Sequence, residues 1–261
     1  MNMLDEFIIR AIVAIFLLAI NSSLAGSFTI FRDVPFLVAG SAHAALAGAA
    51  LFIVLEGWVA INPFLGAVLF AILIAVSASR AKQANVAIGI SFAFSMSLAV
   101  LFISLIKEQA ARVWGLLFGD LLLLTDRDIL MMTTFTVILL AIYLVFMREF
   151  LFISFDAEGA EVSGINVAWF NVLLLSTISL ATVVAMKAVG AILVYAMLMA
   201  PAAAANRVAG SVGRVFLLSG VFALVAGFLG MLVAMILPVA PSAVAALMVT
   251  TIYFITLKRR E

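Results

Sequence analysis

The sequence contains no cysteine, one histidine and few charged residues. Of its 261 residues, 67% are hydrophobic and 10% are charged, whereas soluble domains are roughly 45–50% apolar and about 25% charged. A soluble fold would need a polar surface that these residues cannot supply. The absence of cysteine excludes a disulfide framework and thiolate metal sites. The formal net charge of +1 offers no basic excess for binding nucleic acid.

Long apolar runs occupy most of the chain. A membrane-spanning helix needs about 20 apolar residues to cross about 30 Å of hydrocarbon, and the runs do not show the strict alternation of barrel strands. We therefore predict an all-α fold, a polytopic transmembrane helical bundle of eight to nine spans. It would form a single domain over residues 1–261 and lie in the cell membrane as a multi-pass protein. The expected spans are 8–28, 36–56, 62–79, 85–106, 129–148, 168–186, 188–204, 215–237 and 242–257.

Basic residues set the predicted orientation, because lysine and arginine gather in cytoplasmic loops. The C-terminal run Lys258-Arg259-Arg260 places that end inside the cell. Counting spans back puts the N-terminus outside. Lys187, between two adjacent spans, is expected to extend its ammonium to the outer interface, with an ion pair to an outer carboxylate as the alternative.

The second expected span carries the one histidine, His43, among small residues. Gly40, Ala44 and Gly48 lie on one helical stripe beside it, and small residues let a second helix approach closely. We therefore expect the imidazole to point into this tight region and not toward lipid. Two roles remain open: a ligand or gate residue near mid-membrane, or a neutral histidine hydrogen-bonded to a neighbouring helix.

Other polar side chains within the spans are candidates for a translocation pathway, because polar groups in hydrocarbon are costly. Hydroxyl groups also bond to their own helix and help helices to pack, and this second role is the more common one. The candidate pathway residues are Asn21, Ser22, Ser41, Ser91 and Ser95, together with Met96, which lies beside the face that Ser91 and Ser95 share.

The sequence has none of the patterns of nucleotide hydrolysis or nucleophilic catalysis. It has no phosphate-binding loop of the type G-x-x-x-x-G-K-[ST], no G-x-S-x-G and no H-E-x-x-H. No span centre carries the carboxylate that is typical of proton- or sodium-coupled carriers. We therefore predict a protein that is not an enzyme and that receives energy from a partner chain or acts as a passive conduit.

Several segments match, in order along the chain, the patterns of one transporter family. The most specific match is to VAxKxVGAxL followed by LLxxPAAxA, over 184–193 and 198–205. The others are 26–32 with 42–48 (LAHAxLxG), 117–122 (GDxL), 155–164 (FDxExAxxxG) and 238–242. The chain thus resembles the membrane subunits of ATP-binding-cassette importers for zinc, manganese and iron.

The resemblance implies a type II importer permease that works as a homodimer. Its implied partners are a second copy of itself, two cytoplasmic ATPase subunits and an external solute-binding protein. The transported substrate would be a divalent metal ion, with no permanently bound cofactor and with ATP used only by the partner subunit. Nucleic acid is not an expected partner.

The resemblance also assigns roles to two connections. After Pro201, which we expect to end its span, Ala202, Ala205, Asn206 and Arg207 would form a short helix that couples to the ATPase. The alternative is a simple turn between spans. In the outer connection, Trp114, Gly119 and Asp120 would receive the binding protein.

Two departures from the family pattern bear on the substrate. Ala39 stands where the family commonly has an acidic residue four positions before His43, and Ala93 stands where many members carry a fourth-span ligand. Divalent ions favour carboxylate or imidazole donors, so His43 would give only a weak site, shared by two copies. An importer of the same architecture that carries a metal chelate or another small organic substrate is the alternative.

Overall fold

The computed structural model describes residues 3–56, 62–105, 115, 119 and 121–257. Over these residues the chain is helical and has no strand. The helices are α1 (Met3–Asn21), the π-helix η1 (Ser22–Gly26), α2 (Ser27–Phe31), α3 (Phe36–Leu55), α4 (Pro63–Arg80), α5 (Ala84–Leu105), α7 (Asp126–Val145), α8 (Met147–Phe155), α9 (Ala157–Val162), α10 (Val167–Val208), α11 (Val212–Ile236) and α12 (Pro241–Leu257).

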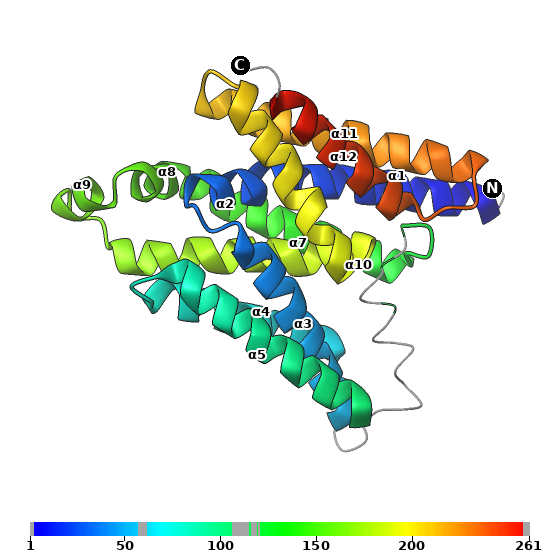
Figure 1. The fold of residues 1–261 in the computed structure, drawn as a ribbon, viewed down its shortest axis with the longest axis horizontal. Coiled ribbons are helices and arrows are strands. Elements are labelled where there is room, and N and C mark those ends of the chain that lie inside the picture. The colour runs from blue at the N-terminus through cyan, green and yellow to red at the C-terminus, as the bar shows by residue number, and fades with distance from the viewer. Residues whose placement is uncertain (1–2, 57–61, 106–114, 116–118, 120, 258–261) are drawn as a thin grey trace.

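The predicted all-α bundle of membrane spans is confirmed. Seven described helical segments are long and apolar enough to cross a membrane, and α12 is a shorter apolar helix. One of the seven, α10, breaks at Gly190, where φ is 81° and ψ is 161°, and the chain changes direction there (Figure 1). Counted as two, the halves of α10 give nine apolar segments in the described part of the chain, in agreement with eight to nine spans.

The helices form two groups joined by α10. Helices α3, α4 and α5 pack on one another, while α1, α11 and α12 pack on the other side of α10. Figure 1 shows the first group (blue to green, lower part) leaning away from the second. α10 contacts members of both groups, so its position links them.

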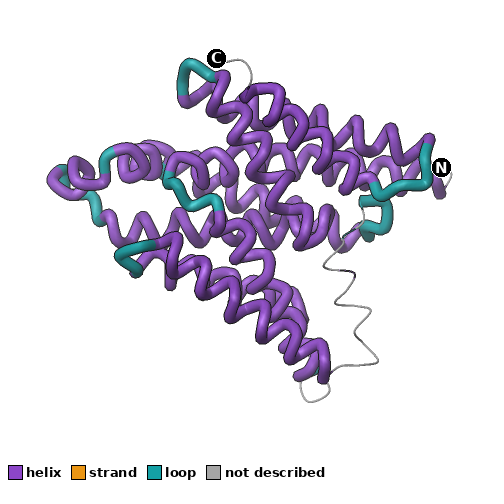
Figure 2. The backbone as a smooth tube through the Cα atoms, in the orientation of Figure 1, coloured by secondary structure: helices purple, strands orange, loops and turns teal. Residues whose placement is uncertain are grey.

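The two ends of the bundle carry different elements. The short helices α8 and α9 and the α4–α5 connection lie at the left in Figure 1, and the N-terminus lies at the right. Figure 2 shows the described loops at these two ends. Following the predicted orientation, we refer to the end with α8 and α9 as the inner end and to the opposite one as the outer end.

A very close helix contact lies between α3 and α4. A Cβ placed on Gly48 would lie 2.1 Å from the carbonyl oxygen of Gly66, and a Cβ on Gly66 would lie 2.3 Å from the carbonyl oxygen of Gly48. Only glycine at both positions allows this approach of the two backbones. The small-residue stripe predicted on this span therefore does bring a neighbouring helix close.

Candidate functional site

His43 lies on the side of α3 that the rest of the chain leaves partly open. In the first ten residues of α3, only Phe36, Ala39 and His43 keep measurable exposure, and their spacing puts them on one face. The ring of Phe92 on α5 meets the imidazole edge-on, with centroids 4.9 Å apart. Nδ1 of His43 is buried and has no hydrogen-bond partner among the described residues.

The donors for a metal ion near His43 are few in a single chain. The described residues contain no group of three His, Cys, Asp or Glu side chains that could hold a metal ion. Ala39 on α3 is partly exposed, and Ala93 on α5 is exposed. These are the two positions at which the sequence departs from the family pattern. Within the described part of the chain, His43 therefore belongs to no cluster of such side chains that could complete a metal site.

The first two pathway candidates, Asn21 and Ser22, are buried and join helices. The Asn21 amide donates to the Leu17 carbonyl at 2.8 Å and to Oγ1 of Thr136 on α7 at 2.9 Å. The Ser22 hydroxyl donates to the Leu198 carbonyl of α10 at 3.3 Å. These bonds match the packing role that polar side chains often have between helices, and a role in the pathway stays a prediction.

The remaining pathway candidates lie on α3 and α5. Oγ of Ser41 lies 2.7 Å from Oγ of Ser179 on α10, and both residues are buried. On α5, Ser95 is buried, while Ser91 and Met96 are partly exposed. In the described part of the chain, no hydrogen bond or ring contact joins Ser91, Ser95 or Met96 to His43. The role of these candidates in a pathway therefore also stays a prediction.

A cavity of about 730 Å³ opens at the outer end, between α3 and α4 on one side and α10 and the start of α7 on the other. Apolar residues of α3, α4 and α10 form most of its wall, and its charged side chains are Asp128 and Lys187. Nζ of Lys187 lies 3.2 Å from Oδ1 of Asp128. The ion pair that the sequence left as the alternative for Lys187 is therefore present.

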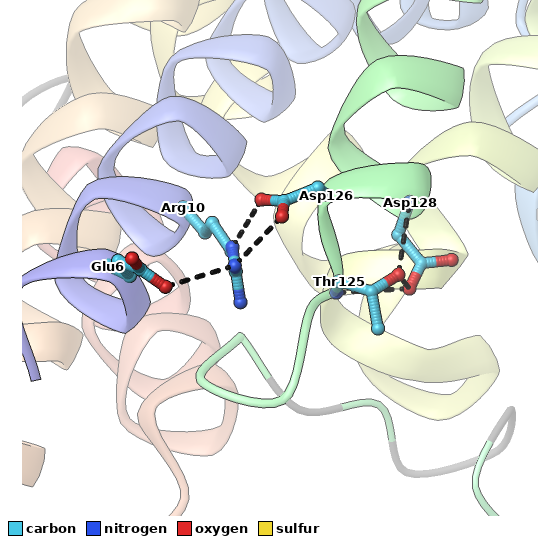
Figure 3. Close-up of polar contacts among 5 residues, drawn as sticks. All are labelled: Glu6, Arg10, Thr125, Asp126 and Asp128. Carbon is cyan, nitrogen blue, oxygen red and sulfur yellow. Dashed lines mark hydrogen bonds and ion pairs between the residues drawn. The ribbon is translucent and has the colours of Figure 1, made fainter. Parts of the chain in front are cut away.

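Asp128 is oriented by a capping box at the start of α7 (Figure 3). Its Oδ2 accepts from Oγ1 of Thr125 at 2.7 Å and from the Thr125 backbone N–H at 3.2 Å. Two residues earlier, Asp126 binds Arg10 of α1 through two hydrogen bonds of 2.6 and 3.0 Å. The first turn of α7 thus ties α10 and α1 to the same outer position. The spacing Thr-x-x-Asp was a signal in the sequence for the capping box, but not for the two ion pairs.

Of the three residues predicted to receive the binding protein, Gly119 is described, while Trp114 and Asp120 lie outside the described residues. Gly119 adopts a φ of 58° and lies directly against the break in α10. A Cβ there would lie 2.2 Å from the backbone nitrogen of Gly190. Gly119 and Gly190 both have a positive φ, and their backbones are in contact. The two segments that resemble the family each contain one of these glycines, and neither segment alone indicated the contact.

At the inner end, the prediction that Pro201 ends its span is wrong. α10 continues through Pro201 to Val208. A proline removes one N–H donor and strains a helix in water, but in an apolar environment the remaining helical bonds are the only partners that the backbone has. The chain therefore keeps the helix.

Within the predicted coupling segment, the side chains differ in exposure. Pro201, Ala202 and Ala205 are buried within the chain, and the Ala202 methyl packs against Gly26 of η1. Asn206 is exposed and Arg207 is partly exposed. The short helices α8 and α9 lie at the same end of the bundle (Figure 1) and expose Phe155, Asp156 and Glu158.

The fold and these positions can be compared with known proteins. The model of the ABC 3 transport family matches residues 4–260. The chain belongs to the ABC 3 transport family. It is a multi-pass membrane permease, as the motifs of the sequence had indicated.

Curated relatives match this ABC 3 family chain over nearly its whole length. It is 31% identical over 255 residues to the manganese transport system membrane protein MntC of Listeria monocytogenes, with 96% of this chain and 89% of that protein covered. It is 30% identical over 264 residues to the manganese import system permease protein ScaB of Streptococcus gordonii, with 98% and 93% covered.

A solved structure shares the fold. The chain superposes with a TM-score of 0.85 on a chain in the structure of PsaBC from Streptococcus pneumoniae in complex with Fab, with 28% sequence identity. The match covers 96% of this chain and 91% of that chain. The type II importer-like permease fold expected from the resemblance is confirmed.

Proposed function

We propose that this chain is the permease subunit of an ATP-binding-cassette importer for manganese ions. The observation that carries the proposal is the near full-length match to permeases named for manganese import. Among zinc, manganese and iron, the relatives therefore favour manganese. The divalent ion is the transported substrate, and ATP hydrolysis belongs to a partner subunit.

Two copies of the chain form the pathway in this proposal. The partly exposed face of α3 carries His43 and leaves room for a second copy to bring its own imidazole. Mn²⁺ prefers oxygen donors, so two imidazoles with serine hydroxyls and water hold it weakly. Weak binding suits passage, because an ion that is held tightly leaves slowly.

The inner end receives the ATPase subunits. Asn206 and Arg207 are the parts of the predicted coupling segment that a partner can reach, since Ala202 and Ala205 are covered by the chain itself. The neighbouring α8 and α9 add exposed apolar and acidic side chains to this surface. ATP-driven closure of the partners moves this surface and switches access between the two sides of the membrane.

The outer end receives an external solute-binding protein on the connection that contains Trp114, Gly119 and Asp120. The close contact of Gly119 with Gly190 gives this connection a direct link to the break in α10. Docking there would release manganese at the outer mouth of the pathway.

Uptake of manganese by cells that express the permease with its ATPase and binding protein tests the proposal. We expect uptake to require all three proteins, and His43→Ala to lower it about tenfold or more, as losses around metal sites generally do. Ser97→Ala, an exposed change on α5, serves as the control. Normal uptake by a normally expressed His43→Ala variant would refute the role of the imidazole.

A second candidate function is import of a metal chelate by the same architecture. Ala39 and the lack of a cluster of metal-binding side chains among the described residues favour it, because a chelated ion brings its own donors. Stimulation of ATP hydrolysis in the reconstituted complex separates the two candidates. Stimulation by manganese ions and not by manganese chelates rejects the second candidate, and the reverse result rejects the first.

A further inference from the structure

Arg32, the residue that follows α2, joins two different helices at the inner end. Its Nη1 donates to the carbonyl of Ile153 on α8 at 2.6 Å. Its Nη2 donates to Oδ1 of Asn171 on α10 at 2.8 Å. One guanidinium thus holds the short helix α8 and the central helix α10 at the same time.

Asn171 extends this connection to a third helix. Its amide nitrogen donates to the carbonyl of Ser79 on α4 at 3.3 Å. A neighbouring bond, from the Asn85 amide to the carbonyl of Asp33 at 3.0 Å, ties α5 to the turn that contains Arg32. A continuous set of hydrogen bonds therefore runs from α8 through Arg32 and Asn171 to α4.

The acceptors at the two ends of this set are helix ends. Ile153 and Ser79 lie within the last four residues of α8 and α4, whose carbonyls have no partner inside their own helix. Helix C-termini carry partial negative charge and favour a cation. Burial lowers the pKa of the Arg32 guanidinium, and charge-assisted bonds to these acceptors offset the loss of water.

The helices that these bonds join lie at places that matter for the proposed transport. α8 and α9 lie on the surface that the proposed function gives to the ATPase, and α4 packs against α3, the helix of His43. The hydrogen-bonded set is therefore a short physical connection from the inner surface to the helix group that lines the pathway. Such a connection transmits movement only if its members shift together.

We propose that Arg32 is a positioning residue that transmits the movement of α8 and α9 to α10 and α4 during ATP-driven transport. The inference rests on the proposed function, since it requires an ATPase at the inner surface. Lysine cannot replace Arg32 here, because a single ammonium on a flexible stem does not reproduce the fixed fork that reaches two acceptors at once. Asn171→Asp separates the two links, because it keeps an acceptor for Arg32 and removes the donor to Ser79.

The test uses the purified complex of permease and ATPase in liposomes, with the binding protein and manganese ions added. Manganese uptake and ATP hydrolysis are measured in the same vesicles. We expect Arg32→Lys and Asn171→Asp to keep assembly and ATP hydrolysis but to lower the manganese transported per ATP about fivefold or more, within the usual range of coupling between sites. Arg80→Lys is the matched control, because Arg80 follows Ser79 and is exposed.

The ratio of transport to hydrolysis distinguishes transmission from a purely structural role. A structural role lowers the amount of active complex, and both rates then fall in parallel. Such a parallel fall, or a ratio equal to that of Arg80→Lys in both variants, overturns the inference. Failure of the proposed function is read from the wild-type complex alone, as manganese uptake that does not depend on ATP.

Discussion

Helices α3 and α5 lie side by side, yet the rest of the chain buries them to very different extents. Within the most apolar stretch of each, 72% of the residues of α3 are buried in this chain, against 17% for α5. α5 is nevertheless the more apolar of the two by mean hydropathy. Hydropathy therefore identifies both as membrane spans and does not tell which one faces protein.

Side-chain size distinguishes the two helices. α3 reads Ala-Gly-Ser-Ala-His-Ala-Ala-Leu-Ala-Gly over 39–48 and lets other backbones come close. α5 carries large exposed side chains such as Ile90, Phe94 and Leu101. In lipid, where apolar surface gains little from being buried against another helix, close packing of small residues decides which helix sits inside.

The largest expected effect comes from adding volume to each helix. Gly48→Leu on α3 forces a side chain into the Gly66 backbone, whereas Gly89 on α5 has nothing within 4 Å of a new Cβ. We expect Gly48→Leu to cost about 3 kcal/mol or more and to abolish folded protein, as seen by fluorescence-detected size exclusion. Gly89→Leu should behave like wild type. Equal damage by both changes would show that α5 is packed as closely at Gly89 as α3 is at Gly48.

Much of the fold was predictable because membrane spans depend on length and hydrophobicity alone. The division of α10 was also predictable: the sequence separated two spans at Lys187, and the observed break lies at Gly190, three residues later. The end of a span at Pro201 was predicted wrongly. Proline is a strong helix stop in water, but within apolar surroundings the rest of the chain decides whether it breaks a helix.

The candidate site was less predictable, because its contacts join distant parts of the chain. The sequence singled out His43 and the stripe of small residues, and the close contact at Gly48 is confirmed. Nothing local indicated that Phe92 would meet the imidazole or that Arg32 would reach both Ile153 and Asn171. Such partners are separated by 49 to 139 positions and are fixed only when helices pack.

Truncating an aromatic ring on each face of α5 gives the second expected effect. Phe92 contacts His43, while Phe94 is 64% exposed and faces away from the chain. We expect Phe92→Ala to lower manganese uptake several-fold, since the loss of an aromatic contact of about 1 kcal/mol lets the imidazole turn. Phe94→Ala should leave uptake in proteoliposomes close to wild type, and a larger loss from Phe94→Ala would show that its face also has a specific partner.

The smallest expected effect comes from removing one hydroxyl from each helix. Ser41 of α3 shares a buried hydrogen bond with Ser179 of α10, whereas the exposed Ser97 of α5 bonds back to the Ala93 carbonyl of its own helix. A bond between membrane helices contributes about 0.6 kcal/mol on average, so Ser41→Ala should lower the melting temperature of the purified permease slightly. Ser97→Ala should leave it unchanged or raise it, because a serine that bonds to its own helix slightly weakens that helix. If Ser97→Ala proved the more damaging change, Ser97 would have a polar partner outside this chain, and the exposed face of α5 would be a contact surface at that position.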